Sequence, residues 1–104
     1  MSISTDLYRT FFCVGLHLSF SKAAKDIGVS QSAISQSIKQ LERELDMTLF
    51  ERTTKSVAFT PEGKELFETV AKAFSILDNG VTQLQERMSH EQESLKLAAT
   101  DTLC

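Results

Sequence analysis

A run of short polar side chains in the first third of the chain has the residue types and the spacing of a surface that reads DNA bases. Gln31, Ser32, Ser35 and Gln36 fall on the polar face of a predicted helix. The amide of Gln can form two hydrogen bonds with adenine, and a Ser hydroxyl can bond to several base edges. We therefore predict that Gln31 and Gln36 are the foremost base-contacting residues, followed by Ser35.

Other residues of this region have the chemistry to hold the phosphate backbone, which positions a DNA-binding protein without specifying sequence. Arg52 is the foremost of these, because its side chain can reach a phosphate or a narrow minor groove. Ser30 and Ser32 also have simpler structural roles, and Ser30 stands where a helix cap is needed, although a helix N-terminus can bind phosphate too. The further predicted anchors are Ser21, Lys22, Lys39, Thr53, Thr54 and Lys55.

Two helices are predicted ahead of this polar face. The first covers about residues 6–17, where Thr5-Asp6 can cap it, and Leu7, Phe11 and Val14 give it a buried stripe. The second covers about residues 20–27 behind the capping residue Ser19. Gly28 follows where the chain must turn, because glycine adopts the left-handed conformation without steric cost.

The third helix, over about residues 31–45 with Ser30 as its cap, is the candidate reading helix. Its apolar residues follow one another at steps of four, three and four, so that they form one stripe for the core and leave the opposite face polar. These residues are Ile34, Ile38, Leu41 and Leu45. A Gly turn between two short helices is typical of a helix-turn-helix, whose second helix enters the major groove.

A small β-hairpin is predicted between Leu49 and Thr60, where apolar pairs bracket the polar run ERTTKS. Thr60-Pro61-Glu62 then combines a capping hydroxyl, a proline at the first helical position and an acid in the first turn. The fold class is therefore mainly α: a winged helix-turn-helix of three helices and a hairpin over residues 1–60, followed by a long helix over residues 61–90.

The long helix carries a heptad seam, which is typical of helix pairing. The seam residues are Phe67, Val70, Phe74, Leu77, Val81, Leu84 and Met88. A helix of this length is too long for a 60-residue domain to cover, so we predict a homodimer; a helix folded back onto its own domain is the alternative. Asn79-Gly80 lies within the seam, and a kink or break there would disturb its second half.

The last segment, residues 91–104, changes character again. Leu95-Lys96-Leu97 alternates apolar and polar residues as a strand does. A lone strand has nothing to pair with, so we expect this chain to stop just inside a further domain.

Charge is the main argument against a DNA-binding function. The net charge is -3 overall, but residues 1–60 carry seven basic and six acidic residues, and residues 61–104 carry four and eight. The acidity therefore lies away from the predicted reading helix. A net charge of +1 in the first segment still requires its basic residues to share one face.

Neither an enzyme nor a metal site is predicted. Cys13 lies in an apolar run and is expected to be a packed thiol, and Cys104 is expected to have no role. His17 is expected to be a helix-end residue, since we find no Asp, Glu or Cys neighbours that complete a ligand set. Neither His17 nor His90 forms a triad, no glycine loop cradles phosphate, and no cofactor is expected. The chain shows no signal peptide and no membrane-spanning run, which predicts a cytoplasmic protein.

These motifs together resemble the N-terminal DNA-binding region of the LysR-type transcriptional regulators over roughly residues 5–90. The matching positions are Phe20, Ala23-Ala24, Ser30-Gln31, Ser35, Leu41-Glu42, Leu49-Phe50, Arg52, Thr60 and Gly63. Lys55 departs from a common Arg of the family, Phe59 from a common Leu, and His17-Leu18 from an acid or glycine. Lys at position 55 replaces a two-pronged contact by a point charge.

The resemblance implies a bacterial regulator that binds double-stranded DNA bearing an interrupted inverted repeat. It also implies dimerisation through the long helix and often a tetramer at full length. It further implies a C-terminal domain of the periplasmic-binding-protein type that senses a small-molecule effector, with Leu95–Thr100 as its first strand. Two other interpretations remain: a helix-turn-helix that docks protein rather than DNA, which the near-neutral first segment favours, and a winged-helix regulator of another family. The SQSAIS and ELDMTLFERT runs argue against the last of these.

Overall fold

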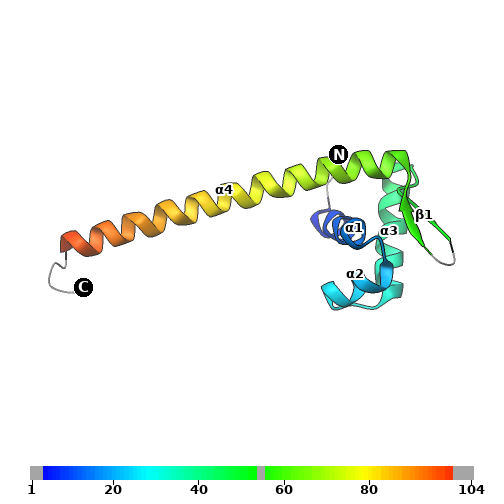
Figure 1. Ribbon diagram of the computed structural model, residues 1–104, viewed down its shortest axis with the longest axis horizontal. Coiled ribbons are helices and arrows are strands. Elements are labelled where there is room, and N and C mark those ends of the chain that lie inside the picture. Colours follow the sequence, from blue (N-terminus) through cyan, green and yellow to red (C-terminus); the bar gives the residue numbers. More distant parts are fainter. Residues whose placement is uncertain (1–3, 54–55, 100–104) are drawn as a thin grey trace. The chain divides into compact units, whose positions relative to one another are not determined.

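The computed structural model describes residues 4–53 and 56–99. Their elements, in chain order, are α1 (Thr5–His17), α2 (Phe20–Ile27), α3 (Gln31–Leu45), β1 (Phe50–Arg52), β2 (Val57–Phe59) and α4 (Pro61–Ala99) (Figure 1). The chain divides into two compact units after Ala71. We call the first unit the head and the helical residues 72–99 the arm, and we describe each by itself. No helix among the described residues is both long enough and apolar enough to cross a membrane.

Serine side chains begin the first three helices. Ser19 Oγ accepts a hydrogen bond from the Lys22 amide at 3.1 Å, and Ser30 Oγ accepts one from the Ala33 amide at 3.0 Å, so both predicted caps are confirmed. The cap predicted at Thr5-Asp6 is wrong, because Thr5 is already helical. Ser4 has the extended backbone that a cap needs, and its hydroxyl accepts from the Leu7 amide at 3.5 Å.

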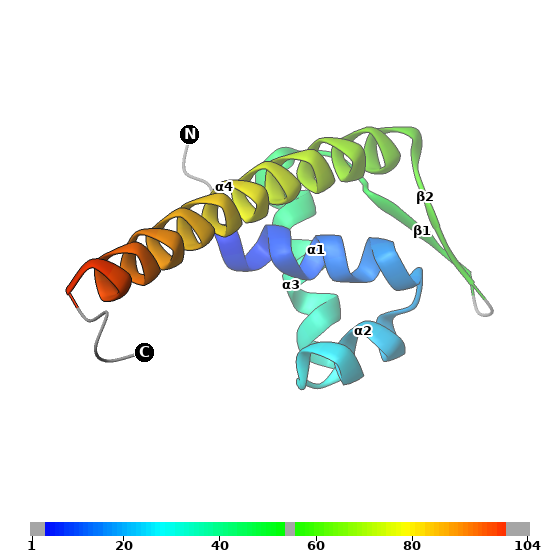
Figure 2. The same ribbon diagram turned by 60° about the vertical axis from the view of Figure 1, so that its left-hand side comes forward.

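The turn between α2 and α3 depends on Gly28. Its φ of +85° is the left-handed conformation, and its amide donates to the Ala24 carbonyl at 2.8 Å. The predicted helix-turn-helix is therefore confirmed in both its helix bounds and its turn. Figure 2 shows α1, α2 and α3 grouped together in the head.

The core of the head lies where these three helices meet the hairpin. Its least exposed large side chains are Phe11, Val14, Ile34, Ile38, Leu41 and Leu49. Aromatic rings extend this core, with the Phe11 and Phe50 centroids 5.4 Å apart and the Phe59 and Phe67 centroids 5.1 Å apart. The third helix thus buries its predicted apolar stripe, although Leu45 at its end is only half-buried.

The predicted hairpin is confirmed as an antiparallel pair in which Phe50 faces Phe59 and Arg52 faces Val57. Thr60 joins it to α4. The buried Thr60 hydroxyl donates to the Thr48 carbonyl at 2.6 Å and accepts from the Gly63 amide at 2.9 Å. This bond to Gly63 is the helix cap that the sequence predicts.

Gly63 is a point of close approach between α4 and the chain entering β1. A Cβ added to Gly63 would lie 2.8 Å from the carbonyl carbon of Leu49 and would also meet its carbonyl oxygen. A side chain at this position would therefore push against backbone.

The helix α4 is longer than predicted. Its 39 residues correspond to about 58 Å at 1.5 Å per residue. Asn79-Gly80 lies within it without a break. The strand predicted over Leu95–Thr100 is wrong up to Ala99, because α4 continues to that residue; Thr100 lies outside the described residues. Glu, Gln, Leu, Lys and Ala dominate this stretch and are strong helix formers, whereas a three-residue alternation has no strand to pair with.

The predicted seam of α4 is divided between the two units. Phe67 and Val70 belong to the head: Phe67 stacks on Phe12 at 5.3 Å between centroids, and Val70 is 6% exposed. Their apolar character is therefore explained by the core of their own chain. In the arm, by contrast, the seam residues Leu77, Val81, Leu84 and Met88 are 45–65% exposed in the single chain.

Candidate nucleic-acid interface

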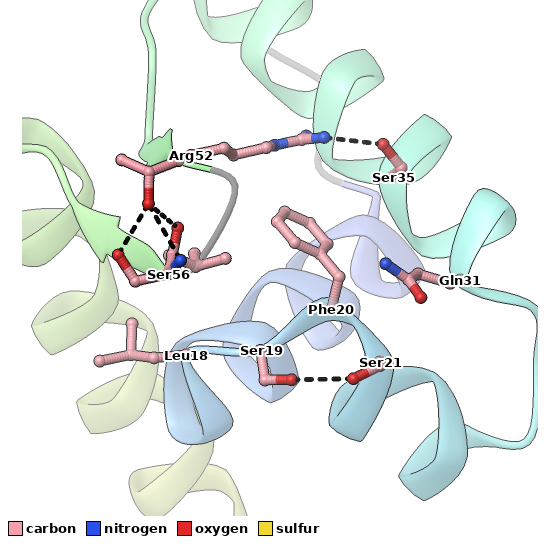
Figure 3. A pocket seen from close by; sticks show the side chains of 10 residues that line it. Leu18, Ser19, Phe20, Ser21, Gln31, Ser35, Arg52 and Ser56 are labelled. Atoms are coloured by element: carbon pink, nitrogen blue, oxygen red, sulfur yellow. Dashed lines mark hydrogen bonds between the residues drawn. The ribbon is translucent and has the colours of Figure 1, made fainter.

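A cleft of the head brings together side chains from α2, α3 and the hairpin. Its volume is about 340 Å³. The residues that line it are Leu18, Ser19, Phe20, Ser21, Gln31, Ser35, Arg52, Thr53, Ser56 and Val57 (Figure 3). Five of the twelve residues predicted to contact DNA thus lie around one hollow, although they are spread over 33 positions of the sequence. We call it the reading cleft.

The guanidinium of Arg52 is fixed within this cleft by two contacts. Its Nη1 donates to Ser35 Oγ at 2.9 Å, and its Cζ lies 4.2 Å from the centroid of the Phe20 ring (Figure 3). A guanidinium over an aromatic face is attracted by the negative charge density of the ring. Arg52 has five N–H donors, and Ser35 takes one of them, so the side chain is held while it keeps donors that can bind an anion.

Ser35 therefore has a structural partner that the sequence did not predict. It is half-buried, and its hydroxyl oxygen accepts from Arg52 rather than lying fully exposed on the outer face of α3. The Ser35 side chain links the N-terminal half of α3 to the end of β1, next to the tip of the hairpin.

The outer face of α3 carries the other predicted base-contacting residues. Gln31, Ser32, Gln36 and Lys39 are all exposed. The first acidic residue of this helix is Glu42, so its N-terminal half carries no negative side chain. Although residues 1–60 together have a net charge close to zero, the N-terminal half of α3 therefore has no acidic residue.

The N-terminus of α2 contributes Ser21 and Lys22, and both are exposed. Ser21 Oγ lies 3.2 Å from the capping Ser19 Oγ (Figure 3). Because the amides and the dipole at a helix N-terminus attract anions, these residues share one end of α2 with a favourable site for phosphate. Ser30 is equally exposed at the start of α3, where its hydroxyl is the helix cap.

The tip of the hairpin is closed by Thr53 and Ser56. The Thr53 amide donates to the Ser56 carbonyl at 2.9 Å, and Thr53 Oγ1 accepts from the Ser56 amide at 3.0 Å. Thr53 is exposed, but its hydroxyl is already engaged in the turn. Thr54 and Lys55, also predicted anchors, lie outside the described residues.

Glu42 positions the start of the hairpin, a role that periodicity alone did not reveal. Its Oε2 accepts from the Leu49 amide at 2.7 Å and from the Phe50 amide at 3.4 Å. The carboxylate thereby fastens the start of β1 to the end of α3, and so sets where Arg52 emerges. In the sequence, Glu42 stood out only as a position that matches the family. A Glu on a helix is otherwise expected to be a solvent-exposed charge.

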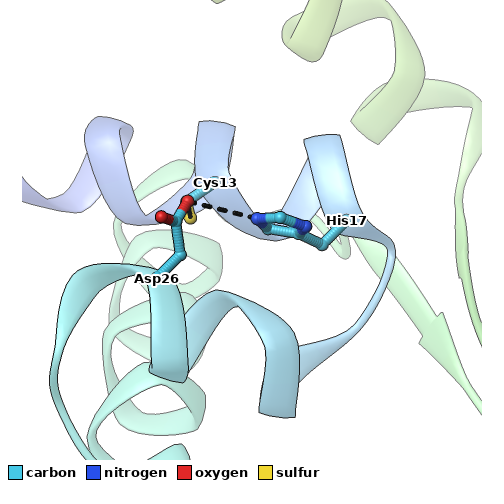
Figure 4. A group of neighbouring side chains, drawn as sticks. All are labelled: Cys13, His17 and Asp26. Atoms are coloured by element: carbon cyan, nitrogen blue, oxygen red, sulfur yellow. Dashed lines mark hydrogen bonds and ion pairs between the residues drawn. The ribbon is translucent and has the colours of Figure 1, made fainter.

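A second polar cluster lies between α1 and α2, and none of its three residues lines the reading cleft. Cys13 Sγ lies 3.4 Å from Asp26 Oδ2, and His17 Nε2 lies 3.2 Å from the same oxygen (Figure 4). Burial, with the Asp26 hydrogen bond, raises the pKa of the Cys13 thiol to about 11. Hydrogen bonds from His17 and then Cys13 lower the pKa of Asp26.

Two predictions about this cluster have different outcomes. The packed Cys13 thiol is confirmed, since the residue is 7% exposed. The expectation that His17 lacks ligand-type neighbours is wrong, because Cys13 lies one helical turn before it and Asp26 reaches it from α2. The i, i+4 spacing of Cys13 and His17 was a visible signal, whereas the approach of Asp26 required the fold.

Known proteins with similar sequences are transcriptional regulators. An HTH-type transcriptional regulator of Escherichia coli K12, YcaN, is 38% identical over 103 residues, which cover 99% of this chain and 32% of that protein. The activator AmpR of Providencia stuartii is 32% identical over 92 residues, covering 88% of this chain and 32% of that protein. The chain thus spans about a third of the length of these curated relatives.

Solved structures similar to this one include complexes with DNA. The DNA-binding domain of BenM bound to catB site 1 DNA has a TM-score of 0.77 and 31% identity, covering 86% of this chain and 96% of that one. Its complex with benA site 1 DNA has a TM-score of 0.76 and 32% identity, covering 84% and 98%. The fold class predicted from the sequence is confirmed by this similarity.

The sequence profile of the lysR family of bacterial regulatory helix-turn-helix proteins matches residues 5–64, which include α1, the helix-turn-helix, the hairpin and the start of α4. This match covers more than half of the chain and contains every element that lines the reading cleft. The chain therefore belongs to the LysR family of bacterial regulatory helix-turn-helix proteins.

Proposed function

We propose that the head binds double-stranded DNA in a sequence-specific manner, with α3 in the major groove. The observation that carries this proposal is Arg52, held by Phe20 and Ser35 beside the acid-free half of α3. In this arrangement Gln31 and Gln36 meet base edges, while Arg52 and the N-terminus of α2 meet phosphates. Two BenM complexes with DNA, whose protein shares this fold, support DNA binding by the head.

The direct test is selection of binding sites from random duplex DNA, followed by fluorescence anisotropy on the selected site. Gln36→Ala should relax the preference at one base position, at a cost of about 1–3 kcal/mol for the selected base. Gln40→Ala is the matched control, because Gln40 is exposed on the same helix but bonds to Glu44 at 3.5 Å. Equal effects of the two substitutions would contradict the base-reading role of Gln36.

Arg52 should act on all sequences alike. Arg52→Ala should weaken binding to selected and unrelated DNA by similar factors, and should reduce the slope of log K against log salt by about 1. Arg43→Ala, at an exposed position in the last turn of α3, is the control and should leave both quantities nearly unchanged. An unchanged salt dependence for Arg52→Ala would remove Arg52 from the phosphate contacts.

We also propose that a second copy of the chain covers the seam of the arm. Leu77, Val81, Leu84 and Met88 present a row of half-exposed apolar side chains at heptad spacing, which two helices can bury together. Pairing two heads would raise the DNA affinity of a protein whose single head has little net charge, and it predicts an inverted repeat in the selected DNA.

Sedimentation velocity at micromolar concentration tests this pairing. Leu84→Asp should shift the chain towards monomer, because a charge enters an apolar seam, whereas Gln83→Asp adds the same charge off the seam and should leave a dimer. A monomeric natural chain would contradict the pairing. A dimer that binds no DNA even at low salt would instead favour a protein-docking helix-turn-helix, the rival function.

For the whole regulator we propose a cytoplasmic protein whose remaining part, beyond this chain, senses a small-molecule effector and supports a tetramer. The support is that the curated relatives are about three times as long as the matched region. Thermal shift assays of the full-length regulator against a metabolite panel would identify an effector. The proposal fails if no compound raises the Tm of the full-length regulator by more than it raises the Tm of this 104-residue chain.

A further inference from the structure

The cluster between α1 and α2 has the composition of a metal site. Cys13 offers a sulfur, His17 a ring nitrogen and Asp26 a carboxylate oxygen, and these three atoms lie within 4.8 Å of one another (Figure 4). Sulfur, nitrogen and oxygen together are a ligand set that suits Zn²⁺ rather than Mg²⁺ or Ca²⁺, which bind oxygen.

The distances between the ligand atoms fit a single small cation. With bonds of about 2.3 Å to sulfur and about 2.0 Å to nitrogen and oxygen, a tetrahedral Zn²⁺ site has edges of about 3.5 Å from S to O and about 3.3 Å from N to O. The corresponding distances here are 3.4 Å and 3.2 Å. Two of the three edges therefore match such a tetrahedron, and the third, from the Cys13 sulfur to the His17 nitrogen, is at most 4.8 Å.

The backbone supports this placement. Cys13 and His17 are four residues apart on α1 and share one face of it, and α2 supplies Asp26 opposite them. Cys13 is buried, whereas 33% of the His17 side chain and 61% of the Asp26 side chain are exposed to solvent. A cation would thus be reached from solvent, with water as its fourth ligand.

We propose that Cys13, His17 and Asp26 bind Zn²⁺ and thereby cross-link α1 to α2. The thiol hydrogen that now bonds to Asp26 leaves as one proton, and the thiolate sulfur binds the cation. The Nε2 hydrogen that His17 now donates to Asp26 is given up as the ring takes the neutral tautomer protonated at Nδ1, so that His17 binds through the Nε2 lone pair; no group is oxidised or reduced. Since the site exists only in the folded head, the cation stabilises the head over its unfolded chain.

Co²⁺ is the first probe, because a thiolate bound to it absorbs in the near ultraviolet and tetrahedral coordination gives strong visible bands. The chain has two cysteines and two histidines, so the double variant Cys104→Ser, His90→Gln leaves Cys13 and His17 as the sole residues of their types. This variant and the natural chain should both bind one Co²⁺ with the thiolate band, and Zn²⁺ should abolish the band. Zn²⁺ should also raise Tm.

Substitutions at the three ligands decide the outcome. When Cys13→Ala is added to the double variant, the thiolate band should disappear. Asp26→Asn, at an exposed position, should weaken binding by more than the factor of about 10–100 that loss of an outer partner costs. Far-ultraviolet circular dichroism checks that each variant is folded, and Asp26→Asn gives the answer if Cys13→Ala is not.

Three results would overturn the site. The first is a folded double variant that gives no thiolate band at millimolar Co²⁺. The second is a band that survives Cys13→Ala. The third is an affinity and a Zn²⁺-induced rise in Tm that Asp26→Asn leaves unchanged.

Discussion

Replacing Gly63 by Ala tests the close packing of α4 on the chain entering β1. A new Cβ would lie 2.8 Å from the carbonyl carbon of Leu49 and closer still to its carbonyl oxygen, so reaching an ordinary separation of about 3.5 Å requires a shift of at least about 0.7 Å. The opposing atoms are backbone and cannot rotate away. The shift therefore separates Leu49 from its partners, which are the Thr60 amide at 3.1 Å and the Glu42 carboxylate at 2.7 Å.

The expected size of the effect follows from three contributions. Overpacking costs about 1–3 kcal/mol, and each weakened hydrogen bond adds up to about 1 kcal/mol. The helix preference of Ala over Gly offsets about 1 kcal/mol of this. Gly63→Ala should therefore lower the free energy of unfolding by about 2 kcal/mol. Because β1 moves with Leu49, Arg52 should also lose its alignment with Ser35, and DNA binding should weaken.

Gly80→Ala is the matched control in the same helix. A Cβ there meets no atom within 4 Å, so only the helix preference remains and the change should stabilise by up to about 1 kcal/mol. Urea denaturation, followed by circular dichroism at one protein concentration, measures the difference. Gly63→Ala should have a midpoint about 1–2 M lower than the natural chain, if the free energy of unfolding falls by about 1–2 kcal/mol per M urea. If Gly63→Ala matched Gly80→Ala, the close approach to Leu49 would be refuted.

Three further predictions concern single polar groups. Glu42→Ala should destabilise the head by about 1–3 kcal/mol in urea denaturation, because the Leu49 and Phe50 amides lose their acceptor; an effect no larger than that of Glu44→Ala would contradict this. With Cys104→Ser and a chelator present, Cys13 should react with a thiol reagent at pH 8 at least about 100-fold more slowly than in urea, because its pKa of about 11 leaves about 0.1% thiolate; equal rates would show an accessible thiol. Asp26 has a lowered pKa, so its contribution is present above its unfolded pKa and lost as the pH falls through the folded one; acid titration should show the stabilities of the natural chain and Asp26→Asn converging at low pH.

Local chemistry in the sequence was enough to predict the helix-turn-helix. Ser19, Gly28 and Ser30 act within three or four residues of themselves, so their types alone define where α2 ends and α3 begins. The hairpin was predicted for the same reason, from a change of apolar spacing. Ser4 was missed because three adjacent polar residues could each serve as a cap, and only the backbone conformation distinguishes them.

Contacts between distant residues could not be predicted. Arg52 meets Phe20 across 32 positions, and Asp26 meets Cys13 across 13, so neither pair leaves a local pattern. The strand predicted at the end of α4 was wrong for a different reason. The alternation at Leu95-Lys96-Leu97 was given more weight than the helix-forming residues around it, although three residues are too few to define a strand.

The position of Arg52 has a consequence for the entropy of recognition. A free Arg side chain samples many rotamers, and ordering it costs about 2 kcal/mol. Here the Phe20 ring and the Ser35 hydroxyl restrict those rotamers when the head folds. The conformational entropy is thus lost during folding rather than at the encounter with DNA, so more of the phosphate contact remains as affinity.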